Sequence, residues 1–157
     1  MIRTYGPGCR DCRYDVVEIP TLAAWPFALF PSHLLLCMDA VRLPSEQLAD
    51  VAESLLLGGL HAVLCHGPDC QRVHDVFADR EAALDATGRL DRDMDATVDI
   101  SFHEDERFAD VLFAFAMFRP HDTYPVPTVR TAVVIDEPER ARDLHRWLPA
   151  FCERRPG

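Results

Sequence analysis

The sequence predicts an α/β fold, because short apolar runs alternate with stretches of helical periodicity along the chain. Four such runs each end in an acid, a histidine or a cysteine, and they cover residues 34–38, 62–64, 97–102 and 131–135. Strands that alternate with helices indicate a mostly parallel sheet, whose ligands gather at the carboxyl ends of the strands. We therefore expect one three-layer, Rossmann-like domain with four or five strands and a shared polar rim.

The expected strands are short and apolar, as in sheets that are covered on both faces. Residues 33–38 read His-Leu-Leu-Leu-Cys-Met without interruption, which is typical of a buried parallel strand. Residues 61–65, 98–102 and 130–135 are the other strands expected in this sheet. Residues 14–19 form a further candidate strand, which we expect to be an antiparallel edge.

Helix boundaries follow from proline, glycine and capping residues. The first helix is predicted to start with Ser45 as its N-cap and to stop at Gly58 and Gly59. Later helices are expected over residues 67–84 and 104–118, and a last one from Asp136 until Pro149 ends it.

The length of 157 residues indicates a single domain. We expect an irregular N-terminal segment over residues 1–13, because Gly6, Pro7 and Gly8 interrupt it. The α/β domain is predicted to cover residues 14–149, and residues 150–157 to form a C-terminal tail.

The charge of the chain limits its partners. Its formal net charge is −10 and its pI is about 5.0. Binding to phosphate backbones or anionic lipid requires a basic surface, so we expect neither nucleic acid nor membrane as a partner. A cation or a basic partner is compatible with this charge. All 16 basic residues are arginine, which excludes chemistry that depends on lysine.

Six cysteines without a recognisable secretory leader indicate reduced thiols, so a cytoplasm of bacterial type is the expected compartment. Five cysteine and histidine residues are candidate zinc ligands: Cys9, Cys12, Cys65, Cys70 and His74. Cys9 and Cys12 form a CxxC pair, and Cys70 and His74 share one face of a helix. Capping turns and buried thiols explain the same residues without a metal. The start of a helix could lower the pKa of Cys70.

Acids and histidines at the strand ends are the candidates for catalysis. Carboxylate oxygens could bind Mg²⁺, and a neighbouring histidine could help to activate water. The candidates for this chemistry are Asp39, His66, Asp69, His103, Glu104 and Asp136. For Glu104–Glu106, favourable interaction with a helix dipole is the competing explanation.

Two stretches, CHGPDCQRVHD at 65–75 and HEDE at 103–106, resemble a family of small bacterial domains of unknown function. The resemblance implies a Rossmann-like domain and no particular chemistry. If the motifs are functional in that family, the positions to carry over are Asp69, Cys70, His74, Asp75, His103 and Glu104.

The function we expect is a non-catalytic binding or interaction domain. It would contact a protein or small ligand through the acidic rim, or through an aromatic helix that presents Phe113 and Met117 to a partner or a second copy. The alternatives are a metal-dependent hydrolase or nucleotide-processing enzyme at the same rim, and a structural zinc protein. The sequence assigns no cofactor. Zinc and Mg²⁺ are the two metal ions that the candidate residues could hold.

Overall fold

The computed structural model describes residues 1–6, 12–90, 97–117 and 129–153, with side chains up to residue 150. These residues form a mixed α/β fold with six strands and four α-helices. In chain order the elements are β1 Ile2–Tyr5, β2 Arg13–Ile19, the short helix η2 Leu22–Ala24, β3 His33–Met38, α1 Ser45–Leu57, β4 Ala62–His66, α2 Cys70–Ala86, β5 Asp99–His103, α3 Phe108–Met117, β6 Val129–Ile135 and α4 Pro138–Glu153.

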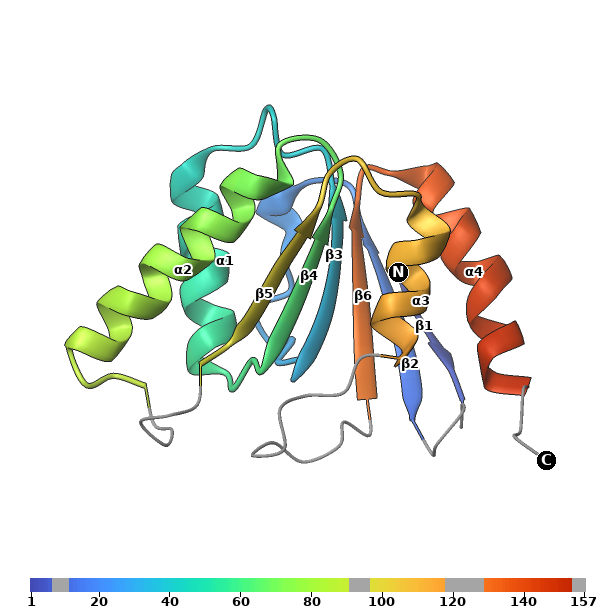
Figure 1. Cartoon of the computed structure of the whole chain (residues 1–157), viewed down its shortest axis with the longest axis horizontal. Helices are drawn as coiled ribbons and strands as arrows, with labels where there is room; N and C mark the ends of the chain where they lie inside the picture. Colours follow the sequence, from blue (N-terminus) through green and yellow to red (C-terminus); the bar gives the residue numbers. More distant parts are fainter. Residues whose placement is uncertain (7–11, 91–96, 118–128, 154–157) are drawn as a thin grey trace.

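The strands form one sheet in the order β1-β2-β6-β3-β4-β5, in which only β1 is antiparallel to its neighbour. The expected parallel arrangement of the buried strands is confirmed. The carboxyl ends of β2 to β6 therefore share one edge of the sheet, which we call the carboxyl edge and which lies at the top of Figure 1.

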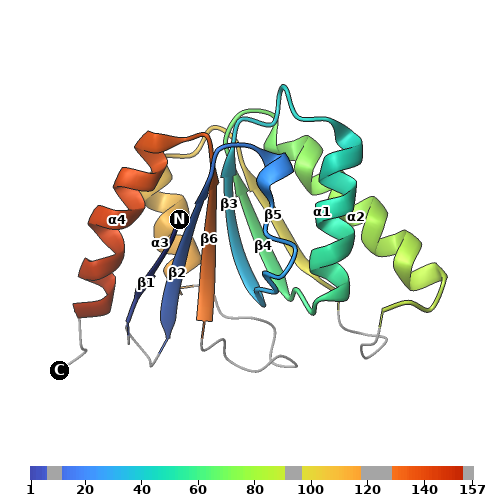
Figure 2. The same ribbon diagram turned by 180° about the vertical axis from the view of Figure 1, so that it is seen from behind.

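Helices cover both faces of the sheet (Figures 1 and 2). On one face, α1, α2 and η2 pack against alternate residues of β3 and β4, such as Leu34, Leu36 and Val63. On the other face, α3 and α4 pack against the intervening residues, such as Leu35 and Leu64. This alternation follows from the two-residue period of a strand, and it explains why β3 is buried along its whole length.

The strand count corrects the expected four or five. Residues 2–5, within the segment expected to be irregular, form β1, which pairs with β2 from Ile2 opposite Val17 to Tyr5 opposite Tyr14. Its first three residues are exposed, so no hydrophobic pattern signals this strand. The prediction that 14–19 form an antiparallel edge was wrong, since β2 runs parallel to β6 and β1 takes the edge position.

Two helix boundaries also differ from the prediction. The helix expected from residue 104 begins at Phe108, so the three acids at 104–106 precede it. Pro149 lies inside α4 and does not end it, so the segment expected as a tail from residue 150 is helical through Glu153. A proline this close to a C-terminus removes one hydrogen bond of the last turns, which a helix held by packing tolerates.

The expected cap of α1 takes another role. Pro44 occupies the N-cap position, and the helix makes no side-chain cap hydrogen bond. The Ser45 hydroxyl oxygen instead accepts a hydrogen bond from Arg72 of α2 at 3.1 Å. A hydrogen bond between a hydroxyl and a residue of another helix cannot be recognised from the local sequence around the hydroxyl.

Candidate functional site

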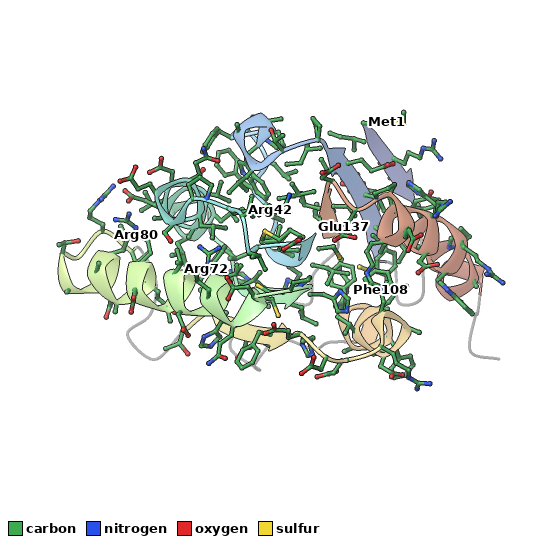
Figure 3. All side chains as sticks on the ribbon, turned by 90° about the horizontal axis from the view of Figure 1, so that it is seen from above. Met1, Arg42, Arg72, Arg80, Phe108 and Glu137 are labelled. Atoms are coloured by element: carbon green, nitrogen blue, oxygen red, sulfur yellow. The ribbon has the colours of Figure 1, made fainter. Side chains whose placement is uncertain are left out.

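The carboxyl edge carries two groups of polar residues, one at the ends of β4 and β5 and one at the ends of β2 and β6. Asp39 follows β3, between the two groups in the order of the sheet. Figure 3 looks onto this edge and shows Arg72 on α2 on one side of the sheet, with Phe108 and Glu137 on the side of α3 and α4.

In the β4–β5 group, His66 and His103 are register partners on neighbouring parallel strands. The ring of His66 is 2% exposed and packs on Phe108 at 5.1 Å between centroids. Its Nε2–H donates to the backbone oxygen of Glu106 at 3.2 Å. Burial lowers the pKa of His66, and the bond to Glu106 opposes this shift. His66 is thus a neutral, buried ring that anchors the β5–α3 loop.

His103 is bonded through both of its ring nitrogens. Nδ1 lies 2.9 Å from Oε1 of Glu106, and Nε2 lies 2.9 Å from Oγ of Ser101. Ser101 was not among the residues singled out from the sequence, and Glu106 was noted only as part of the run at 103–106. The available signal was the two-residue spacing of Ser101 and His103, which places both on one face of a strand.

The two sequence motifs of the resemblance meet at the start of α2. The backbone N–H of Asp69 donates to Oε1 of Glu104 at 3.1 Å, and Oδ2 of Asp69 accepts from Nε of Arg72 at 2.7 Å. Arg72 also donates to the backbone oxygen of Ala40. Asp69 and Glu104 therefore join three loops of the carboxyl edge. The catalytic hypothesis requires both residues to be available to a ligand, whereas here each makes an internal hydrogen bond.

Gly67 brings the first two loops together. Its φ is +127°, and a Cβ at this position would lie 2.0 Å from the backbone oxygen of Met38. The N–H of Ala40 donates to the backbone oxygen of Pro68 at 3.0 Å. Only glycine allows this approach of two backbones. Asp39, at the turn between Met38 and Ala40, is exposed and accepts the N–H of Val41 at 3.0 Å.

The thiols next to this group are packing residues. Cys65 and Cys70 are each 1% exposed and belong to the core under α1 and α2. Burial raises the pKa of both thiols, so the expected lowering at Cys70 by the helix start is corrected: desolvation outweighs it. His74 lies on α2 with its ring 5.4 Å from that of Phe102 and its Nδ1 3.0 Å from Asp75.

The zinc hypothesis required Cys9 and Cys12 to approach these residues. Cys9 lies outside the described residues. Cys12 precedes β2 and packs under α3 and α4, at the opposite edge and on the opposite face of the sheet from Cys70. Within the described ranges, no three His, Cys, Asp or Glu residues are grouped so that they could hold a metal ion. The six rim candidates lie among these described residues and form no such group. They meet in pairs: His66 lies beside His103, and Glu104 accepts the Asp69 N–H.

The β2–β6 group surrounds an open pocket of about 260 Å³. Its walls come from the ends of both strands and the first turns of α4: Glu18, Ile19, Pro20, Val134, Asp136, Glu137, Pro138 and Ala141. Asp136 has a φ of +52°, and its N–H donates to the backbone oxygen of Ile19 at 3.1 Å. This bond closes β2 onto the β6–α4 turn. Of the pocket residues, the sequence analysis had identified only Asp136 as a candidate.

A second open pocket, of about 540 Å³, adjoins the first and shares Glu18, Pro138 and Ala141 with it. His145 of α4 lines it and contacts β2 and β1 through both nitrogens. Its Nε2 lies 2.8 Å from Oε1 of Glu18, and its Nδ1 is hydrogen-bonded to the hydroxyl of Tyr5. These contacts fix Glu18 in the wall between the two pockets.

The outer face of α3 carries the interface residues expected from the sequence. Phe113 and Met117 are 55% and 40% exposed, whereas Phe108, Val111, Leu112 and Phe115 are buried.

No helix among the described residues has the length and apolar character needed to cross a membrane.

Together these features define a mostly parallel α/β domain with a polar carboxyl edge and open pockets beside α4. The chain belongs to a family described as a domain of unknown function (DUF7684), which matches residues 12–151. No curated protein and no solved structure matches it.

Proposed function

We propose that this chain is a binding domain that recognises a basic group of a protein partner in the pocket at the ends of β2 and β6. We infer, too, that its layers are arranged as in Rossmann-like domains, since helices pack on both faces of the parallel strands. In such sheets the carboxyl edge is the usual place for a ligand.

The observation that carries the proposal is the composition of this pocket. Glu18, Asp136 and Glu137 are among the residues that line it, and Ile19 and Pro138 are among its apolar residues. A volume of about 260 Å³ suits one side chain better than a whole cofactor. An arginine or lysine would place its methylene stem on the apolar part and its charge near the acids.

The charge of the chain supports the same class of partner. A net charge of −10 attracts basic molecules and speeds their association, and this attraction weakens as salt increases. Asp136 and Glu137 make no ion pair with another of the described residues, and Asp136 is exposed. Their carboxylates can therefore face a ligand without first breaking an internal bond.

The test is the binding of a fluorescently labelled arginine-rich peptide, followed by anisotropy at low and moderate salt. The double variant Asp136→Asn, Glu137→Gln should weaken binding about fivefold or more, if each exposed charge contributes about 0.5 kcal/mol. Asparagine tolerates the positive φ of Asp136, so the turn is preserved. Glu18 is left unchanged because it holds His145.

The matched control is Asp79→Asn, Asp85→Asn, which removes the same charge from exposed positions of α2. It should bind as the wild type does, apart from a small effect of net charge. Equal weakening in both double variants would mean that the pocket has no special role. Absence of binding to the wild type at low salt would refute the proposal.

The outer face of α3 is the second candidate for contact, with a protein or with a second copy. Its support is the exposure of Phe113 and Met117 four residues apart on one helix. Sedimentation of the wild type and of Phe113→Ser, Met117→Ser tests self-association through this face: a lower mass for the variant supports it, and a monomeric wild type excludes it.

A further inference from the structure

Three side chains in the β4–β5 group form a continuous hydrogen-bonded chain. Oγ of Ser101 lies 2.9 Å from Nε2 of His103, and Nδ1 of the same ring lies 2.9 Å from Oε1 of Glu106. A hydroxyl, both imidazole nitrogens and a carboxylate are thus aligned in the order that activates a serine in hydrolytic enzymes.

The bonding partners determine which nitrogen carries the proton. An ionised Glu106 carboxylate can only accept, so Nδ1 of His103 must donate to it. In the neutral ring Nε2 then has the lone pair, and it accepts the hydroxyl proton of Ser101. The geometry therefore makes His103 a base directed at Ser101.

The backbone of Glu106, the acid in this hydrogen-bonded group, is held by a contact of its own. The backbone oxygen of Glu106 accepts the Nε2–H of the buried His66, which itself packs on Phe108. Glu106 consequently reaches His103 from a fixed backbone position. His66 and Glu106 are positioning residues, because they act through His103.

Ser101 lies on an edge strand of the described sheet. β5 is an edge strand of the described sheet, as Figure 1 shows, so Ser101 and His103 have a neighbouring strand on one side only. Both residues are half-buried and lie on the face of the sheet that carries α3, since the intervening Phe102 contacts α2. We propose that Ser101, with His103 as its base, is a nucleophile for small esters at the open edge of β5.

The reaction is a balanced two-step hydrolysis. Oγ of Ser101 bonds to the carbonyl carbon while its proton moves to Nε2 of His103, and the ester C–O bond then breaks as the leaving alcohol takes that proton. Water next adds to the acyl carbon and gives a proton to Nε2. The bond from the acyl carbon to Oγ breaks, and Oγ recovers the proton. Ester and water yield acid and alcohol.

The test is labelling of the full-length protein by a fluorophosphonate, read by intact mass and peptide mapping. The Oγ–P bond forms and the P–F bond breaks, so an activated serine gains one phosphonyl group. We expect one group per chain, on Ser101, and none in Ser101→Ala. Glu106→Gln should slow labelling at least about tenfold, with Glu106→Asp partly restoring the rate.

The matched control is Ser32→Ala. Ser32 also contacts a histidine, but through Nδ1 of His33 at 3.3 Å. Ser32 should not be labelled, so Ser32→Ala should react as the wild type does. Melting temperatures that are equal among the Glu106 variants would separate positioning of the base from folding. No labelling of the wild type, or labelling spread equally over several serines, would overturn the proposal. This site is separate from the pocket beside α4, so a failure of peptide binding leaves it unaffected.

Discussion

Glu104 supports the backbone of Asp69: its Oε1 accepts the Asp69 N–H at 3.1 Å, across 35 positions of the chain. Asp69 directly precedes α2 and has a left-handed φ of +61°. An N–H at the start of a helix lacks an intrahelical partner, and a carboxylate there also interacts favourably with the helix dipole. The interaction is therefore a capping contact made by a residue from another loop.

Glu104→Ala should destabilise the fold by about 1 kcal/mol, because the Asp69 N–H loses its acceptor and α2 loses a favourable charge. Urea unfolding followed by circular dichroism measures this change. Asp105→Ala is the matched control, since Asp105 is the adjacent exposed acid and its side chain makes no hydrogen bond within the described part of the chain. Equal effects of the two substitutions would contradict the capping role.

Gly67→Ala should be far more destabilising than an alanine at another left-handed glycine. Its Cβ would lie 2.0 Å from the Met38 oxygen, whereas a Cβ at Gly88 meets nothing within 4 Å. We expect a loss of at least about 3 kcal/mol for Gly67→Ala and about 1 kcal/mol for Gly88→Ala, where only the positive φ is strained. Unfolding curves measured side by side give both values, and a mild Gly67→Ala would mean that the two loops separate easily.

Arg72 should be sensitive even to a conservative change. Its guanidinium contacts Asp69, Ser45 and the backbone oxygen of Ala40, and thus joins two loops and two helices. Arg72→Lys keeps the charge but cannot reach three acceptors in different directions, so it should lose about 1–2 kcal/mol. Arg107→Lys, at a highly exposed pair with Asp110, should leave the unfolding free energy almost unchanged. A neutral Arg72→Lys would refute the bridging role.

Acid should destabilise the fold through His33. Burial, with repulsion from Arg130 and His61, lowers the pKa of His33 from 6.5 to about 4. Between these values the unfolded chain binds the proton and the folded chain does not, so stability is full above pH 6.5 and falls as the pH decreases towards 4. The shift corresponds to about 3 kcal/mol at most. Unfolding free energies measured from pH 7 to pH 4 should decline less steeply in His33→Asn than in the wild type, and equal slopes would exclude His33.

The strands with uninterrupted apolar sequence were predicted most accurately. His33–Met38 has the predicted bounds, because a strand buried on both faces requires an apolar residue at every position. β1 was missed for the opposite reason: an exposed edge strand is held by backbone pairing with β2, which leaves little pattern in the side chains. The direction of β2 also depended on its neighbours, since the same residues can pair in either direction.

The shared edge of the strand ends was predicted from the sequence, and the contacts among the polar residues there were not. Apolar runs that end in polar residues indicated the carboxyl edge, because parallel strands bring their ends together. The partners of each polar side chain came from distant segments, as with His66 and Glu106, or Glu18 and His145. Ser101 was not recognised because its two-residue spacing from His103, the available signal, is common within strands and does not show that the two side chains bond.

The sequence by itself determined the α/β class, the buried strands and the polar residues that follow them, since these depend on local hydrophobic pattern and on composition. Only the tertiary structure decided that Asp69 and Glu104 bind each other, that Cys12 and Cys70 lie on opposite faces, and that Glu18 and Asp136 share a pocket. The physical reason is that a hydrogen bond or a pocket depends on atomic separations of a few ångströms, which are set by how the strands are ordered in the sheet and how the loops close over its edge.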